Sequence, residues 1–229
     1  MTIIKTKTKR EIALELKPIQ SMLNSLGKLL LPVVWEAKDI FSSLYSAQKE
    51  IDFQDFIEGI AIDFSYNNLN EKDVKRLTKR VSNSKNHQYM SNILDSVFFS
   101  KSKLSRTILG LITGKFLRDD SLDYEDLVLC CALKDTFDED LNAFWRFYGV
   151  PTLKTNVGDK TTFLDEYTEK DRLIIEKLQN NGILGRDLVE GRLAGATIPL
   201  RYEITSVSIR LKDYMNSIQP LFAKVNCFI

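Results

Sequence analysis

Apolar residues recur every three or four positions through most of the first 150 residues, and this periodicity limits the fold more than any other feature. Such spacing places apolar side chains along one face of an α-helix, where they pack into a core. One stripe comprises Ile12, Leu16, Ile19, Leu23, Leu26 and Leu30. Another comprises Phe53, Phe56, Ile57, Ile60 and Phe64. We therefore predict a mainly α fold with a helical bundle body over residues 1–149.

The clearest boundary of this body is Gly149 followed by Pro151, which stops a helix predicted over residues 138–148. Thr136 fits the first position of a capping box at the start of that helix. Residues 150–163 have little periodicity and several turn formers, which predicts a connecting loop.

A C-terminal module is predicted over residues 164–229. Thr168 and Asp171 fit a capping box for a helix that Gly182 stops. Two short segments after Gly182 predict a β-hairpin, and a last helix is expected from Ser206. We expect strands only after residue 182.

Two stretches of this module resemble a known family. The residues EKLQNNGILGRDLV and PLRYEITSVSIRLKDYM are similar to the end of a MarR-type domain, in which a recognition helix leads into the wing of a winged helix. The resemblance covers roughly a quarter of the chain. It implies a winged-helix-like module whose wing arginines contact phosphates, namely Arg186, Arg192 and Arg201. The sequence departs from the family at Ser208, where glycine is common. More distantly, a helical body ending in this hairpin resembles the bacterial abortive-infection alpha family, whose members are associated with phage defence.

Groups that carry catalysis are scarce in the sequence. The single histidine, His87, has no cysteine or second histidine near it to complete a metal site. Cys130 and Cys131 lie in an apolar stretch and are interpreted as small core residues. Three cysteines without a spaced framework favour a reducing cytoplasm. The acidic run over residues 119–126 has Tyr124 where a calcium loop needs glycine. We therefore expect no enzyme activity, no cofactor and no metal.

Charge is split between two neighbouring blocks of the chain. Residues 72–118 hold eleven basic and two acidic residues, a net charge of +9, and residues 119–140 have a net charge of −8. One interpretation is that the blocks face each other, within the fold or across a dimer, or are solvated helix faces. The other is a basic surface for nucleic acid or for an acidic partner protein. The candidate binding residues in that block are Lys101, Lys103, Arg106, Lys115 and Arg118.

Gly110 and Gly114 form a GxxxG motif on a short apolar segment with basic flanks. Small residues at this spacing let two helix backbones approach closely, and we expect such packing inside a helical core. A helix lying on a membrane surface is the alternative interpretation. The sequence shows no run of the roughly 18 apolar residues that a membrane-spanning helix needs.

These observations favour a non-enzymatic cytoplasmic binding protein that acts through protein–protein contacts, in phage defence or counter-defence. A nucleic-acid-binding transcriptional regulator is the first alternative, and a membrane-surface effector is the second. The helix before the hairpin has a net charge of −2 over residues 163–180, which argues against sequence-specific DNA binding. The partner and the presence of a homo-oligomer stay open at this point.

Overall fold

The computed structural model describes residues 43–66, 84–150, 152–154, 160–164, 166–186 and 200–222. These residues form a mainly helical fold with a small antiparallel sheet, which confirms the predicted fold class. The apolar stripe over residues 12–30 and the first part of the basic block, over residues 72–80, lie outside the described residues. The chain divides into two compact units.

The first unit contains three described helical segments. They are α2 (Ser43–Tyr66), α4 (Ser84–Phe99, up to Phe98) and the part of α5 (Lys103–Asp119) that follows Ile108. Most of the stripe predicted on α2 is buried, with Phe56, Ile60 and Phe64 almost fully removed from solvent, whereas Ile57 is half-buried. Buried apolar residues of α4 and α5 complete this core, namely Ile93, Leu94, Val97, Leu109, Ile112 and Leu117.

The GxxxG motif packs helix α5 against helix α2. A Cβ atom added at Gly110 would lie 2.1 Å from the carbonyl oxygen of Phe56 and 2.8 Å from the Cα atom of Gly59. One added at Gly114 would lie 2.7 Å from the Cβ atom of Asp63. Only glycine allows backbones this close, so the predicted close packing inside a helical core is confirmed.

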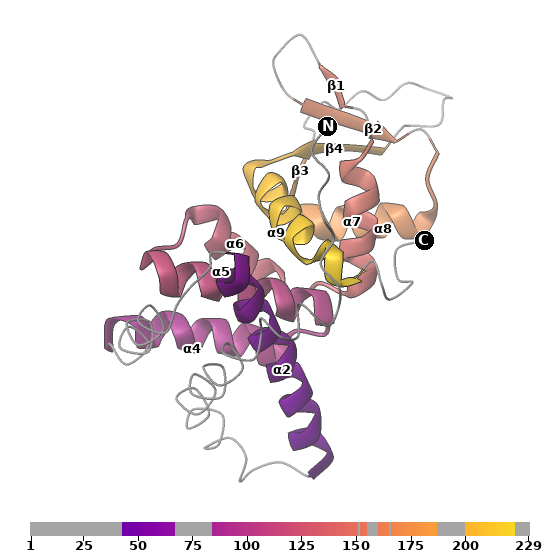
Figure 1. Cartoon of the computed structure of the whole chain (residues 1–229). Coiled ribbons are helices and arrows are strands. Elements are labelled where there is room, and N and C mark those ends of the chain that lie inside the picture. Colours follow the sequence, from indigo (N-terminus) through magenta and orange to yellow (C-terminus); the bar gives the residue numbers. More distant parts are fainter. Residues whose placement is uncertain are drawn as a thin grey trace. The chain divides into compact units, whose positions relative to one another are not determined.

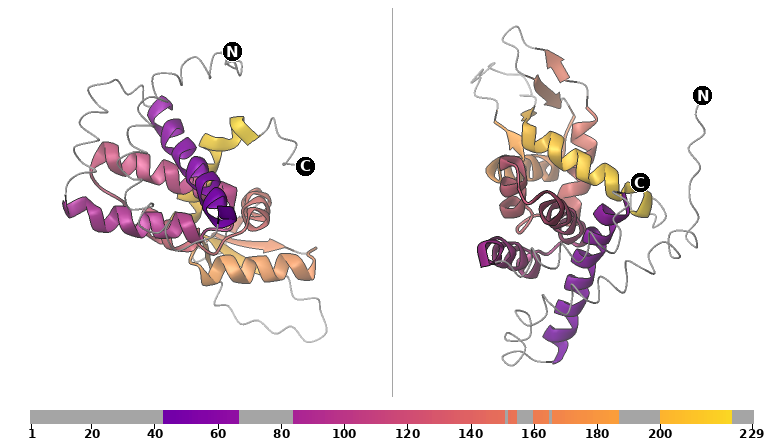
Figure 2. Two further views of the ribbon diagram at one scale, coloured as in Figure 1. Left: turned by 90° about the horizontal axis from the view of Figure 1, so that it is seen from below. Right: turned by 60° about the vertical axis from the view of Figure 1, so that its left-hand side comes forward.

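The second unit contains residues 99–108 and everything described after residue 121. Its elements are α6 (Tyr124–Ala132), α7 (Asp138–Tyr148), β1 (Thr152–Lys154), β2 (Lys160–Leu164), α8 (Glu169–Asn180), β3 (Leu184–Gly185), β4 (Leu200–Ile204) and α9 (Ser206–Phe222). The strands form one antiparallel sheet in the order β1-β2-β4-β3. Helices α7, α8 and α9 lie to one side of this sheet (Figures 1 and 2).

Tyr202 of β4 fixes the sheet to helix α7. Its side chain is fully buried, its ring centroid lies 6.0 Å from that of Phe147, and its hydroxyl donates to the carbonyl oxygen of Phe147 at 2.8 Å. Burial raises the pKa of Tyr202 to about 12, so the phenol stays protonated and keeps donating. The sheet and helix therefore share one core.

The segment over residues 150–163 differs from its prediction. It contains β1 and most of β2, so it is not simply a connecting loop, and strands are not confined to the region after residue 182. Strand β2 pairs with β4 in a register that sets Thr162 opposite Tyr202. A five-residue strand rich in threonine gives little periodicity by itself, and its pairing with a strand about forty residues away decides its structure.

The capping predictions for the helices have mixed outcomes. The capping box of Thr168 and Asp171 at the start of α8 is confirmed, and Gly182, with φ of 73°, follows the end of that helix. At α7 the N-cap is Phe137, one residue after the predicted Thr136. The backbone N–H of Phe137 donates to the carboxylate of Asp140 at 2.9 Å, while the Thr136 hydroxyl donates back to the carbonyl of Ala132.

The two compact units also divide the chain differently from the predicted segments 1–149, 150–163 and 164–229. The division runs through α5, and helices α6 and α7 belong to the same unit as the sheet. This grouping follows from packing, since α6 contacts α9 and α7 contacts α8.

Candidate interaction surface

Four carboxylates of the acidic block contact side chains of helices α8 and α9. Arg210 of α9 lies 2.6 Å from the Asp123 carboxylate, and the Tyr214 hydroxyl donates to the buried Asp126 at 2.8 Å. Lys170 of α8 lies 2.8 Å from Glu139. These four carboxylates therefore serve as partners within the chain for residues of α8 and α9.

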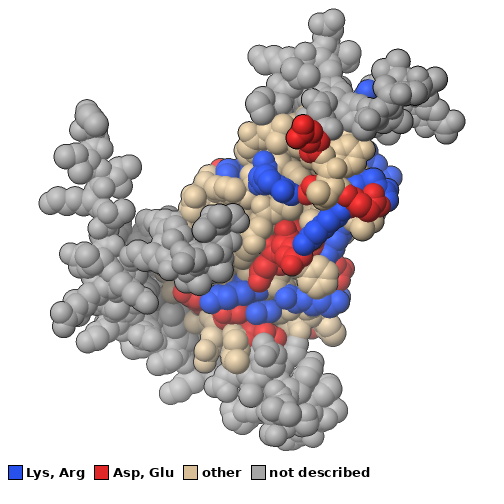
Figure 3. Space-filling model, turned by 90° about the vertical axis from the view of Figure 1, so that its right-hand side faces the viewer, with Lys and Arg blue, Asp and Glu red and all other residues tan. Residues whose placement is uncertain are grey.

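All three basic residues of α8 are held in ion pairs. Lys170 pairs with Glu139, Lys177 pairs with Asp140, and Arg172 bridges Glu169 and Glu176 on its own helix. Lysine and arginine side chains lie among aspartate and glutamate side chains on the face drawn in Figure 3, without forming a surface of one sign. Helix α8 consequently presents little uncompensated positive charge.

Two candidate binding residues of the basic block lie on the part of α5 in the first unit. Arg118 donates to both carboxylate oxygens of Asp63, at 2.8 and 2.7 Å, and to Asp119. Burial raises the pKa of the Asp63 carboxyl above its ordinary value, although the Arg118 charge acts to lower it. Lys115 is half-buried on the same helix. Arg118 thus anchors α5 to α2.

The remaining candidates belong to the second unit. Arg106 is buried and donates to the carbonyl of Ser100 at 3.1 Å, so its guanidinium supports the backbone instead of lying on the surface. Arg186 is exposed and donates to the side chain of Asn180, and Arg201 is half-buried on β4. Arg192 lies outside the described residues. Lys101 and Lys103 are exposed at the start of α5.

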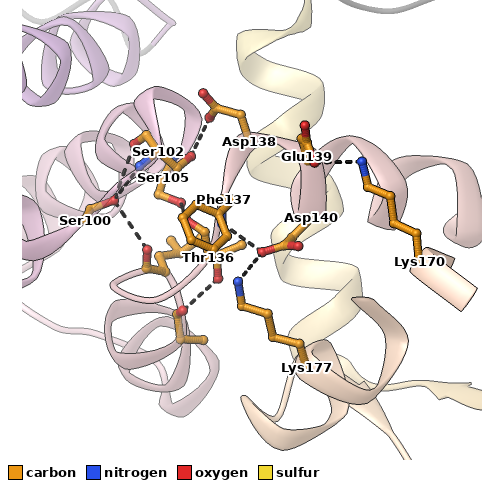
Figure 4. Close-up of polar contacts among 12 residues, drawn as sticks. Ser100, Ser102, Ser105, Thr136, Phe137, Asp138, Glu139, Asp140, Lys170 and Lys177 are labelled. Atoms are coloured by element: carbon orange, nitrogen blue, oxygen red, sulfur yellow. Dashed lines mark hydrogen bonds and ion pairs between the residues drawn. The ribbon is translucent and has the colours of Figure 1, made fainter. Parts of the chain in front are cut away.

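Hydrogen bonds hold the segment before and at the start of α5 against the segment between α6 and α7 (Figure 4). The Ser100 hydroxyl donates to the carbonyl of Leu133 at 3.4 Å, and the Ser105 hydroxyl donates to that of Thr136 at 3.5 Å. The Asp138 carboxylate accepts the Ser102 hydroxyl and, at 2.9 Å, the backbone N–H of Leu104. Residues 99–105 and 132–138 therefore form one fixed surface element.

This element exposes two phenyl rings, each with a lysine from the other segment over it. Phe99 is 61% exposed and Phe137 is 44% exposed. The Lys134 ammonium lies 4.8 Å from the centroid of the Phe99 ring, and the Lys101 ammonium lies 5.5 Å from that of Phe137. Lys177 reaches the Phe137 ring from α8 at 4.0 Å. We call these five residues (Phe99, Lys101, Lys134, Phe137 and Lys177) the lysine–aromatic strip.

Sequence reasoning found only Lys101 of this strip. A usable signal was Phe137, a large apolar residue directly before the acidic first turn of α7, where a small polar cap residue is common. Phe99 at the end of α4 gave no comparable signal, because an apolar residue near a helix end is usually buried.

The polar groups around the strip are engaged in structure. Each serine or threonine hydroxyl in Figure 4 donates to a carbonyl or a carboxylate, and no histidine or thiol lies among them. Burial, followed by the charge of Asp126, raises the pKa of the Cys130 thiol to about 12, so it stays neutral. Cys131 is exposed, contrary to its interpretation as a core residue. Within the described ranges, no three His, Cys, Asp or Glu side chains are placed to hold a metal ion.

No protein-family model, no curated protein and no solved structure matches this chain. The part of the chain that the structure describes contains no helix of the length and apolar character needed to cross a membrane.

Proposed function

We propose that this protein is a non-enzymatic binding protein of the cytoplasm, and that it contacts another protein through the lysine–aromatic strip. The supporting observation is the exposure of the Phe99 and Phe137 rings on a surface element fixed by hydrogen bonds. Aromatic side chains on a rigid backbone are enriched at the centres of protein interfaces, where their burial contributes most of the affinity. A partner that covers both rings gains about 25 cal/mol for each Å² of apolar surface removed from water.

A DNA-binding regulator is the second candidate, and the order of α8, β3, β4 and α9 is what favours it. Two features place it second. The β1–β2 hairpin lies between α7 and α8, where a helix-turn-helix has a short turn. The lysines and the arginine of α8 are neutralised by carboxylates, whereas a helix in the major groove needs positive charge for phosphates.

A membrane-surface effector ranks third. That hypothesis rested on the apolar segment with basic flanks around Gly110 and Gly114. In the structure this apolar face is buried, with Ile108, Leu109, Ile112 and Leu117 almost fully removed from solvent. A helix face that already packs into a protein core is not available to insert into lipid.

The biological setting rests on the resemblance to the abortive-infection alpha family alone. We propose phage defence or counter-defence as the context, so the partner is to be sought with and without phage infection.

Site-specific photocrosslinking in the cells that make the protein tests the contact surface. A photoreactive phenylalanine analogue replaces Phe137 or Phe99 in the full chain, which leaves a ring at each position. We expect discrete adducts with one protein, identified by mass spectrometry and resistant to nuclease. Leu173 of α8, which is 54% exposed and lies outside the strip, is the matched control position.

Adducts from positions 99 and 137 but not from 173 support the proposal. The same adducts from all three positions, or none from the strip, overturn it. Adducts that nuclease destroys transfer support to the nucleic-acid alternative.

A further inference from the structure

The lysine–aromatic strip holds two cations that differ from their neighbours. Lys170, Lys177 and Arg146 each pair with a carboxylate of the second unit, namely Glu139, Asp140 and Asp171. Lys101 and Lys134 make no ion pair with any carboxylate in the described part of the chain. Their ammonium groups lie over phenyl rings instead.

The three acidic residues that follow Phe137 are already engaged. Asp138 accepts from Ser102 and Leu104, Glu139 pairs with Lys170, and Asp140 accepts from Phe137 and Lys177. Drawing any of them toward Lys101 or Lys134 would leave a backbone N–H or another cation without its partner. Their contacts therefore hold these three carboxylates away from Lys101 and Lys134. Asp135, which follows Lys134 directly, is exposed, and the described residues show no ion pair between the two side chains.

A ring beneath an ammonium group orients it without neutralising it. A cation–π contact at an exposed site contributes about 0.5–1 kcal/mol. An ammonium group has three N–H donors, and a ring on one side of it does not engage all three. Lys101 and Lys134 thus present partly ordered donors beside exposed apolar ring surface. A carboxylate is the protein group that satisfies both the charge and the donors.

We propose, building on the function proposed above, that the strip binds an acidic segment of its partner protein. Carboxylates of that segment contact Lys101 and Lys134, and its apolar side chains pack on Phe99 and Phe137. Single-stranded nucleic acid also offers negative charge, but its bases bind by stacking on open ring faces. Here one lysine already lies over the Phe99 ring and two lie over the Phe137 ring, which leaves less ring face open to a stacked base.

Charge reversal tests the chemistry of the partner separately from the location of the surface. The double variant Lys101→Glu with Lys134→Glu is made in the chain that carries the photoreactive group at position 137. Lys212→Glu is the matched control, because Lys212 also lies over an aromatic ring, that of Trp145, and is no part of the strip. Circular dichroism checks that each variant keeps its helical content.

The direct probe is a short fluorescent peptide of glutamate and leucine, with a lysine and leucine peptide and an oligothymidylate as comparisons. Fluorescence anisotropy at low salt measures binding to the full chain. We expect the acidic peptide to bind, the double variant to weaken it about tenfold, which corresponds to about 1.4 kcal/mol, and Lys212→Glu to leave it unchanged. The photo-adduct should fall in parallel.

The outcomes separate the two proposals. An adduct at position 137 that survives the double charge reversal keeps the contact surface and overturns the acidic partner. An oligothymidylate that binds more tightly than the acidic peptide, with the same dependence on the two lysines, also overturns it. Absence of any adduct from the strip overturns the underlying function itself.

Discussion

Replacing Gly110 with alanine tests the packing of α5 against α2. The added Cβ atom would lie 2.1 Å from the Phe56 carbonyl oxygen and 2.8 Å from the Gly59 Cα atom, and both are backbone atoms. No side-chain rotation relieves that overlap, so α2 must move by about 1 Å in a close-packed core. Overpacking costs about 1–3 kcal/mol, and a clash with backbone belongs at the upper end. Alanine gains about 1 kcal/mol in helix propensity. We expect a net loss of about 2 kcal/mol.

Thermal unfolding followed by circular dichroism measures this loss. In a chain of 229 residues, 2 kcal/mol lowers Tm by about 4–8 °C. Gly149→Ala is the control, because its Cβ atom would lie 3.4 Å from the nearest atom and its φ of −79° suits alanine. We expect that variant to melt within about 2 °C of the parent, since one tolerated surface change alters stability by about 0.5 kcal/mol or less. If Gly110→Ala melts at or above the parent temperature, the close approach of α5 and α2 is wrong.

Two further predictions concern titratable groups. Burial acts to raise the pKa of the Asp171 carboxyl, but hydrogen bonds from Thr168 and the charge of Arg146 lower it more, so the pKa lies below its ordinary value. The contribution of Asp171 to stability is therefore present above its ordinary pKa and is lost as pH falls through the lowered pKa. Asp171→Asn should flatten the acid side of a plot of unfolding free energy against pH. An unchanged acid side would contradict this prediction. Iodoacetamide at mildly alkaline pH should alkylate Cys131 and spare Cys130 until the protein unfolds, because Cys130 is buried and its pKa is raised to about 12. Peptide mass mapping measures the labelling. Equal labelling of Cys130 and Cys131 in the native protein would contradict the structure.

Features with a local cause were predictable from the sequence. The start of α8 follows from Thr168 and Asp171, whose side chains and backbones bond to each other within one helical turn. The close packing at Gly110 and Gly114 follows from residue size and helical spacing. In each case the residues that determine the structure lie within a few positions of each other.

Features that depend on distant residues were missed. Strand β2 exists because Thr162 pairs with Tyr202, and the pairing has no trace in the residues around position 162. Phe99 and Lys134 meet only after Ser100 bonds to Leu133 across a separation of 33 residues. Most residues of the lysine–aromatic strip therefore could be identified only from the tertiary contacts.

The two charge blocks show why net charge along a sequence is a poor guide to where a partner binds. The acidic block has a net charge of −8, yet Glu139 and Asp140 serve as counter-charges for lysines of α8. The exposed Lys170–Glu139 pair adds little stability, but both pairs remove charge from the surface. A lysine or arginine is available to a partner only where no carboxylate of its own chain pairs with it. Lys101 and Lys134 meet that condition, because their ammonium groups lie over phenyl rings and make no ion pair within the described residues. Neutralising either lysine should thus weaken partner binding more than neutralising Lys170, although Lys170 carries the same charge and is also exposed.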